Sequence, residues 1–240
     1  MLAHAASDIG KIRTTNEDSF LCVPPHLYIV ADGMGGHAAG EIASQLGVNT
    51  VAGYVAEQPF PDHPTQQGEI LLRQAVEQAN AVIFSRARTN PEYAGMGSTL
   101  TVVYVTGEDV FWSHLGDSRL YLFRGQQLAQ ITNDHSLVGE LLRSGALTRA
   151  EAQVHPQRNI LTRAAGVSEQ AEVDSGHFSR KPGDRLLLCT DGLTGLLTDD
   201  EITAILSVCT GQQALHTLIT EALNAGGIDN ITAILLENSL

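Results

Sequence analysis

The stretch YIVADGMGGHAAGE, residues 28–41, joins a predicted strand to a predicted helix through one carboxylate and three glycines. Four residues of strand-forming character run into Asp32, and the alanine-rich run after the glycines has the pattern of an amphipathic helix. A carboxylate at the end of an apolar strand must be paired, hydrogen-bonded or bound to a metal ion, because a charge leaves water at a high cost. We therefore expect a cation at Asp32. The glycines would let the backbone approach this cation, and a main-chain carbonyl could join its coordination.

The same glycines also match a degenerate dinucleotide-binding pattern, Gly-x-Gly-x-x-Ala, between a strand and a helix. That pattern requires an acidic residue at the end of a second strand about 20 residues further on. Residues 42–56 instead continue the predicted helix, and Asp32 directly before the first glycine would repel a pyrophosphate. The nucleotide-binding hypothesis is therefore the weaker one.

The composition is that of an ordered globular protein, with 43% hydrophobic and 17% charged residues. The 240 residues are enough for one large domain or two small ones with a substantial core. A formal net charge of −13 argues against nucleic acid or an anionic membrane as a partner.

Three cysteines, Cys22, Cys189 and Cys209, have no C-x-x-C spacing, and two of them lie in apolar runs. We expect buried, reduced thiols, which fit a reducing compartment. Residues 1–20 lack the apolar segment of a signal peptide, and every apolar run is shorter than the roughly 18 residues that cross a bilayer. The sequence therefore predicts a soluble, cytoplasmic protein.

Hydrophobic periodicity predicts an α+β domain, in which antiparallel sheets pack face to face and helix pairs cover the outside. The four expected strands between residues 99 and 131 are separated by short turns, which favours an antiparallel meander. Strands are expected at 2–9, 18–24, up to 32, 99–105, 110–115, 119–123, 127–131, 171–178, 185–189 and 231–237, and helices at 38–56, 69–88, 135–144, 148–152, 199–207 and 211–225.

Three further aspartates, Asp117, Asp191 and Asp229, repeat the setting of Asp32 at the edge of a predicted strand. Any one of them could serve as a helix cap or a turn residue. Four together are a poor way to stabilise a core but a good way to build a cluster of oxygen ligands. Such hard donors, without a Cys or His pair at zinc spacing, favour Mg²⁺ or Mn²⁺ over Zn²⁺.

A series of short motifs covers essentially the whole chain: RTTNED (13–18), DGMGGH (32–37), GST (97–99), GDSR (116–119), TNDHS (132–136), LTRAAG (161–166), TDG (190–192) and DNIT (229–232). In this order the motifs resemble the metal-dependent serine/threonine protein phosphatases of the PPM (type 2C) family, and the compact bacterial members most. The resemblance implies a four-layer α-β-β-α sandwich, with two packed antiparallel sheets flanked by helix pairs. It also implies a single catalytic domain over residues 1–240, with a flap subdomain at about 139–165 that selects substrates.

The resemblance also implies a role for each matched residue. Asp32 would bridge two metal ions, Asp191 and Asp229 would complete the first site, and the carbonyl of Gly33 would contribute to the second. By the same resemblance, Asp117, with Asp191, is similar to the ligands of a third, weaker ion, and Glu17, Asp18 and Asn230 would act behind the ligands. Arg13 would bind the substrate phosphate. His37 would protonate the leaving alkoxide.

These roles suit the hydrolysis of phosphoserine and phosphothreonine in proteins by a hydroxide that bridges two Mn²⁺ or Mg²⁺ ions, which would reverse Ser/Thr kinase signalling. Arginine suits phosphate because its planar fork donates two hydrogen bonds at once. The implied partners are phosphorylated proteins and a cognate Ser/Thr kinase, and the expected state is a monomer. The alternative is a catalytically silent module of the same fold that binds phosphoproteins, although such a module should lack some of these ligands.

Other phosphatase chemistries do not fit the sequence. A cysteine phosphatase needs Cys-x5-Arg, but Tyr28, Gly195 and Leu215 stand six residues after the three cysteines. The aspartyl-phosphate class needs Asp-x-Asp, a spacing that does not occur in the sequence. Arg119, directly after the GDS motif, is expected to pair with a structural carboxylate rather than with substrate.

Overall fold

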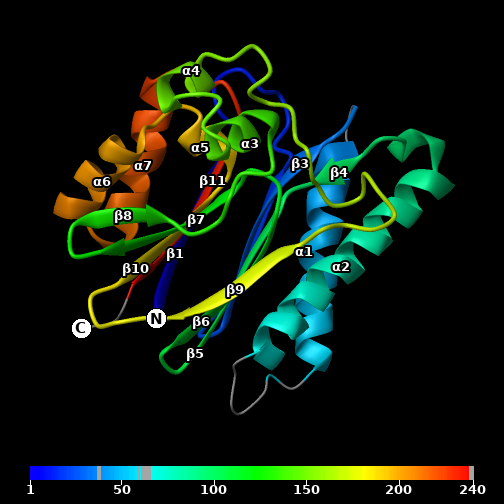
Figure 1. The fold of residues 1–240 in the computed structure, drawn as a ribbon, viewed down its shortest axis with the longest axis horizontal. Helices are drawn as coiled ribbons and strands as arrows, with labels where there is room; N and C mark the ends of the chain where they lie inside the picture. The colour runs from blue at the N-terminus through cyan, green and yellow to red at the C-terminus, as the bar shows by residue number, and fades with distance from the viewer. Residues whose placement is uncertain (37–38, 59, 61–65, 238–240) are drawn as a thin grey trace.

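Two antiparallel sheets stack face to face, with helices on both outer surfaces (Figure 1). The computed structural model describes residues 1–36, 39–58, 60 and 66–237. One sheet has the order β1 (Leu2–Asp8), β11 (Ile231–Glu237), β10 (Arg185–Cys189), β7 (Arg119–Arg124) and β8 (Gln127–Gln130). The other has the order β2 (Asp18–Val23), β3 (Leu27–Met34), β5 (Leu100–Thr106), β6 (Asp109–Leu115) and β9 (Asp174–Ser179), with β4 (Gly97–Ser98) paired to β3.

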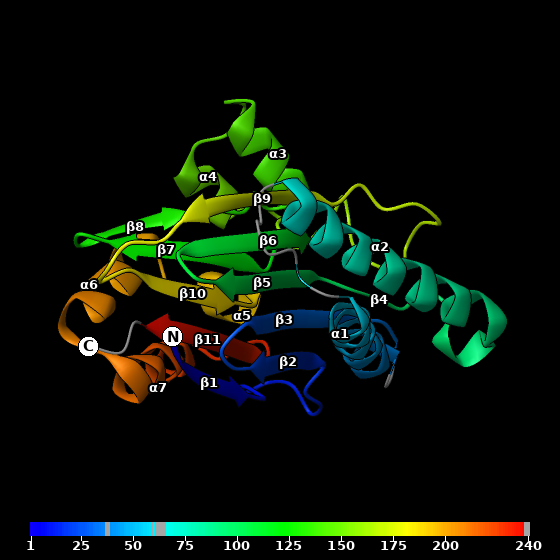
Figure 2. The ribbon, with the colours of Figure 1, turned by 90° about the horizontal axis from the view of Figure 1, so that it is seen from below.

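The helices pack in two groups on the two sheets, and Figure 2 shows the strands between them. The sheet that contains β3 is covered by α1 (Ala39–Glu57) and α2 (Gln66–Thr89), followed by a short 3₁₀ helix, η1 (Pro91–Tyr93). The other sheet is covered by α5 (Asp191–Thr194), α6 (Asp199–Val208) and α7 (Gly211–Asn224). Two short helices, α3 (Leu137–Arg143) and α4 (Arg149–Gln153), lie in the connection between β8 and β9. The predicted four-layer α-β-β-α sandwich is therefore confirmed.

Strand β3 is apolar at successive positions because both of its faces are buried. Ile29 and Ala31 pack in the core shared with α1 and α2, whereas Tyr28 and Val30 pack in the core between the two sheets. This is the alternation of a strand, in which successive side chains point to opposite faces. The alternation places Asp32 on the same face as Tyr28 and Val30, between the sheets.

The inner faces of the sheets change from apolar to polar toward the end where β3 terminates. The Thr99 hydroxyl lies 2.7 Å from that of Ser118 and accepts a hydrogen bond of 2.8 Å from the backbone N–H of Asp32. On the other sheet, the Thr190 hydroxyl also accepts a hydrogen bond, of 3.0 Å, from the backbone N–H of Thr232. These buried hydroxyls satisfy one another and the backbone, so this end of the inter-sheet space can hold charged groups.

The predicted meander between residues 99 and 131 is wrong. β5 pairs with β6, and β7 pairs with β8, but β6 lies beside β9 and β7 beside β10, in different sheets. The chain crosses from one sheet to the other at residues 116–118. Gly116 makes this crossing at φ 107°, and a Cβ atom there would lie 2.5 Å from Thr99 Cγ2. Only glycine meets both requirements without strain, and the crossing brings Asp117 to the polar end of the sandwich.

The other predicted helices and strands are confirmed to within a few residues of their ends. Strand β4 and helix α5 were not predicted, because two and four residues are too short to show a periodicity. Within the described residues, no helix is both long and apolar enough to span a bilayer.

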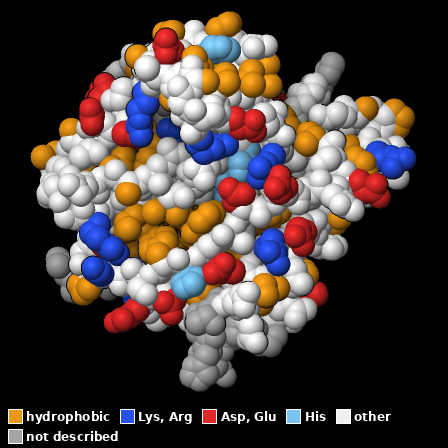
Figure 3. Space-filling view, viewed as in Figure 1, with side chains coloured by type: hydrophobic (Ala, Val, Ile, Leu, Met, Phe, Trp, Pro, Cys, Tyr) orange, Lys and Arg blue, Asp and Glu red, His pale blue; other side chains and the backbone are white. Residues whose placement is uncertain are grey.

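The sandwich is open at the edge formed by β8 and β9. Partly buried side chains of the inter-sheet core, among them Trp112, Ile131 and Phe178, belong to this side of the molecule. Figure 3 shows the apolar surface there as an orange hollow at the left of centre. The polar end described above is a different part of the sandwich. It lies where the loops after β3 and β6 meet.

Candidate active site

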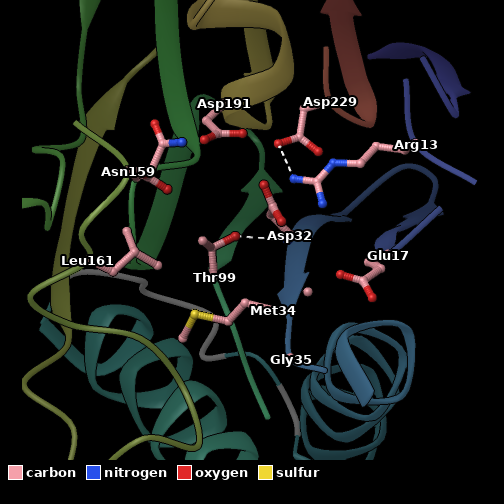
Figure 4. A pocket seen from close by; sticks show the side chains of 12 residues that line it. Arg13, Glu17, Asp32, Met34, Gly35, Thr99, Asn159, Leu161, Asp191 and Asp229 are labelled. Atoms are coloured by element: carbon pink, nitrogen blue, oxygen red, sulfur yellow. Dashed lines mark hydrogen bonds and ion pairs between the residues drawn. The ribbon is translucent and has the colours of Figure 1, made fainter. Parts of the chain in front are cut away.

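A cleft of about 220 Å³ lies at the polar end of the sandwich. Its wall contains the end of β3, the residue before β5, the crossing between β6 and β7, the start of α5 and the loop before β11. The lining residues are Arg13, Glu17, Asp32, Gly33, Met34, Gly35, Thr99, Asp117, Asn159, Leu161, Asp191 and Asp229. The labelled members of this set converge on one space in Figure 4.

The four aspartates singled out from the sequence all line this cleft. Asp32 comes from β3, Asp117 from the crossing between the sheets, Asp191 from the first position of α5 and Asp229 from the loop before β11. These four segments are far apart in the sequence. Their convergence is therefore a consequence of stacking the two sheets, and it brings the predicted carboxylate cluster together.

The cleft raises the pKa of Asp32, Asp117 and Asp191. Burial raises the pKa of Asp32 well above its ordinary value, and the charges of Asp191, Asp18 and Asp117 add to this effect. The pKa of Asp117 is likewise raised well above its ordinary value, first by burial and then by Asp191. Burial, followed by the charge of Asp229, raises the pKa of Asp191. A divalent cation would reverse these shifts, because it favours the ionised form of each carboxylate.

The donor set fits hard divalent cations. Asp191 Oδ1 and Asp18 Oδ1 are buried and have no hydrogen-bond partner among the described residues, which is costly for an ionised carboxylate unless a cation or water completes its surroundings. The carboxylates and the Gly33 carbonyl supply oxygen donors, the type that Mg²⁺ and Mn²⁺ prefer. Gly33 itself can only be glycine, because a Cβ atom there would lie 2.0 Å from the carbonyl oxygen of Gly40.

The carboxylates share the cleft without closing around a single point. Among the described residues, no three Asp, Glu, His or Cys side chains lie close enough together to enclose an ion. Asp229 is engaged by Arg13, whose guanidinium donates a hydrogen bond of 2.8 Å to Asp229 Oδ2 (Figure 4). This bond raises the pKa of Arg13, and the side chain remains 50% exposed. Arg13 is the basic residue among those that line the cleft.

The residues predicted to act behind the ligands occupy two positions. Glu17 lines the cleft, whereas Asp18 and Asn230 lie beneath it. Asn230 Oδ1 accepts a hydrogen bond of 2.8 Å from the backbone N–H of Glu17, and its Nδ2 donates bonds of 2.9 Å to the carbonyls of Ile9 and Thr15. Asn230 thus ties the segment that carries Arg13 and Glu17 to the segment that carries Asp229. The predicted acid, His37, lies outside the described residues.

The family model described as Protein phosphatase 2C matches residues 12–225. The chain belongs to the protein phosphatase 2C family. Its sequence is 38% identical over 245 aligned residues to the serine/threonine phosphatase stp of Listeria monocytogenes, an alignment that covers 100% of this chain and 97% of that protein. The resemblance inferred from the motifs is therefore confirmed.

Solved structures agree with this family assignment. The serine/threonine phosphatase PstP/Ppp of Mycobacterium tuberculosis matches with a TM-score of 0.90 at 38% identity, over 99% of each chain. A crystal structure of the catalytic domain of the serine/threonine protein phosphatase PstP in complex with two manganese ions matches with a TM-score of 0.85 at 36% identity, over 98% of this chain and 96% of that one. A relative of the same fold therefore binds two divalent cations.

Several contributors to the cleft were not predicted from the sequence. Asn159 and Leu161 reach it from the flap, and Met34 reaches it from the end of β3. The hydroxyl of Thr99 supports Asp32 from the inner face of the neighbouring strand. The inward direction of Thr99 could have been predicted from the alternation of side chains along β5, because Thr99 falls on the same face as Val103 and Val105. No comparable signal exists for Asn159, which stands in an irregular segment.

Residues 139–165, the predicted flap, contain most of α3 and all of α4 and are anchored at both helices. Arg143 donates a hydrogen bond of 2.8 Å to the carbonyl of Asp134, and Arg149 forms an ion pair of 2.5 Å with Asp199 at the start of α6. Asp134 also pairs with Arg119 at 2.7 Å. The prediction that Arg119 pairs with a structural carboxylate is confirmed.

Proposed function

We propose that this member of the protein phosphatase 2C family is a metal-dependent enzyme that hydrolyses phosphoserine and phosphothreonine esters in proteins. The observation that carries the proposal is one cleft in which four aspartates and an arginine meet. The carboxylates supply binding sites for divalent cations, and the arginine supplies a phosphate contact. The relatives named above are serine/threonine phosphatases, which favours this activity over a silent phosphoprotein-binding module.

We assign the cation ligands by the family pattern. Asp32 would contribute to two cation sites, Asp191 and Asp229 to the first of them, and the Gly33 carbonyl to the second. Asp117, together with Asp191, would hold a third and weaker ion, and both Mn²⁺ and Mg²⁺ suit this oxygen donor set. When bound, such cations acidify a water molecule at neutral pH and neutralise phosphoryl oxygens.

The chain's own residues would bind and orient the phosphate group. Arg13 is half exposed at the cleft and can donate two parallel hydrogen bonds to phosphoryl oxygens. One of its five N–H groups bonds to Asp229, and a cation that binds Asp229 would release this N–H, so cation binding at Asp229 and phosphate binding at Arg13 would support each other. Glu17, Asp18 and Asn230 would orient water and the ligand-bearing loops. His37 would give a proton to the leaving alkoxide, whose high pKa makes it a poor leaving group.

We further propose that residues 1–240 act as a single catalytic domain in which the flap, residues 139–165, selects substrates. The flap offers Asn159 and Leu161 to the cleft that Arg13 also lines. The partners would be phosphorylated proteins and a cognate Ser/Thr kinase in the cytoplasm. We propose a monomer as the active state, because all the assigned residues come from one chain.

The test is hydrolysis of a phosphothreonine peptide by Asp32→Ala in the presence of Mn²⁺. Loss of the shared ligand should lower kcat by at least 10³-fold, on the order of 4 kcal/mol of transition-state stabilisation. The matched control is Asp200→Ala, which removes an exposed aspartate from the surface of α6. Turnover of Asp32→Ala within tenfold of the control would refute the assignment of Asp32 as a cation ligand. Tight phosphopeptide binding by the wild type without hydrolysis would favour the silent module.

A further inference from the structure

The buried residue His135 forms hydrogen bonds with both the N–H and the carbonyl of Gly116. Its backbone N–H donates a hydrogen bond of 2.7 Å to the carbonyl oxygen of Gly116, and its ring Nδ1 accepts one of 3.2 Å from the N–H of Gly116. Gly116 directly precedes Asp117, which lines the cleft. Since the Gly116 carbonyl belongs to the peptide bond that leads into Asp117, fixing this carbonyl restricts the direction in which the Asp117 side chain leaves the backbone.

The contact to Gly116 also defines the state of the His135 ring. Because Nδ1 accepts a hydrogen bond, the proton of the neutral imidazole resides on Nε2. Nε2 lies 3.2 Å from Asp174 Oδ2, and the other oxygen of Asp174 is 3.2 Å from the guanidinium of Arg163. Burial lowers the pKa of His135, which keeps the ring neutral and its Nδ1 lone pair available.

The opposite side of His135 is held by the C-terminal end of the flap. The carbonyl of His135 accepts a hydrogen bond of 2.8 Å from the N–H of Thr162, and the N–H of Leu137 donates one of 2.9 Å to the carbonyl of Ile160. Ser136 and Leu161 form an isolated antiparallel bridge. His135 is therefore clamped between the loop that carries Asp117 and a segment whose Leu161 lines the same cleft.

The side chain of His135 is 2% exposed, and His135 does not line the cleft. It therefore cannot touch substrate or a cation there. We infer that His135 is a positioning residue: its ring Nδ1 holds the N–H of Gly116 and, together with the backbone bond to the Gly116 carbonyl, sets the direction of the Asp117 carboxylate. The inference rests on the proposed function, because it gives Asp117 a cation to bind.

The decisive variants are His135→Asn and His135→Leu. An asparagine places its Oδ1 near the position of the histidine Nδ1 and can still accept from the Gly116 N–H, whereas leucine fills similar space without an acceptor. Mn²⁺ titration of the chelated protein, followed by isothermal calorimetry, measures tight and weak binding separately and does not depend on turnover. We expect weak-site affinity to fall at least fivefold in His135→Leu and less than twofold in His135→Asn, with tight binding within twofold in both.

His114→Leu is the matched control. The His114 ring is fully buried 4.8 Å from that of His135, but it bonds to the Thr101 hydroxyl at 2.9 Å and the Asn133 carbonyl at 3.1 Å instead of Gly116. This control should leave both classes of Mn²⁺ binding unchanged. Equal weak-site affinity in wild type and His135→Leu would overturn the inference, and so would an equal loss in His114→Leu or His135→Asn. Absence of any Mn²⁺ binding by the wild type would instead overturn the proposed function.

Discussion

Asp18→Asn should stabilise the metal-free protein, and the gain should depend on pH. Asp18 lies directly opposite Asp32 in the register of β2 and β3, so two carboxylates face each other across a strand pair. Burial is the main cause that raises the pKa of Asp18 from 3.8 to about 7, and the charges of Asp191 and Asp229 contribute. The Thr190 hydroxyl donates a hydrogen bond of 2.9 Å to Asp18 Oδ2, which opposes the rise only in part.

The sign of the effect follows from the two pKa values. The folded state holds the Asp18 proton more tightly than the unfolded chain, so the stabilisation is complete below pH 3.8 and is lost as pH rises through about 7. Since each pKa unit corresponds to about 1.4 kcal/mol, the raised pKa of Asp18 should destabilise the fold, relative to pH below 3.8, by about 4 kcal/mol at pH 7.5 and about 2 kcal/mol at pH 5. Asparagine cannot ionise, so it removes this pH-dependent destabilisation. Its side-chain oxygen can still accept the hydrogen bond from the Thr190 hydroxyl.

Urea unfolding in EDTA, followed by the fluorescence of the single tryptophan, measures this free energy at both pH values. Asp18→Asn should unfold at a higher urea concentration than wild type, and the difference should be larger at pH 7.5. Asp200→Asn, on the exposed side of α6, should change the free energy by less than about 0.5 kcal/mol at either pH. A gain that is equal at the two pH values, or a loss at pH 7.5, would refute the reasoning about the buried carboxylates.

Three further substitutions test other parts of the account. Arg13→Ala should raise KM for a phosphothreonine peptide by roughly 10–100-fold and change kcat less, since it removes a phosphate contact; an unchanged KM would contradict that role. Gly116→Ala should lower the free energy of unfolding by about 2–3 kcal/mol, because the residue has a φ of 107° and the added Cβ would collide with Thr99. A variant that unfolds at the same urea concentration as wild type would show that the backbone at the crossing adapts to the alanine. Asn230→Ala should lower it by roughly 2–4 kcal/mol, because it leaves the Glu17 N–H and two carbonyls without partners; a loss below 1 kcal/mol in urea would mean that water replaces the side chain.

The sequence predicted the elements and the carboxylate cluster because both depend on local patterns. The continuous apolar run before Asp32 indicates a strand buried on both faces, and β3 is such a strand. A carboxylate at the edge of each such run requires a partner, which is why Asp32, Asp191 and Asp229 could be grouped before their positions were known. The structure places them in one cleft.

The sequence could not predict how strands pair across long separations. The expected meander failed because the turn at Gly116 leads from one sheet to the other, and nothing in the hairpin pattern distinguishes these outcomes. The ion pair between Arg13 and Asp229 joins residues that are 216 positions apart. The hydroxyl of Thr99, the residue before β5, contributes to the cleft only because it lies on the face that turns toward the second sheet. Such contacts depend on the stacking of the sheets, which local periodicity does not specify.

We propose that the carboxylate cleft hydrolyses phosphoprotein esters with the help of divalent cations. The most direct measurement is the initial rate of phosphate release from a phosphothreonine peptide, by protein that has been treated with a chelator and then supplied with Mn²⁺ or Mg²⁺. We expect no measurable rate in the chelator and a rate that saturates with added Mn²⁺ or Mg²⁺. A rate that is the same with and without the chelator, or no rate with either cation on several phosphopeptides, would contradict it.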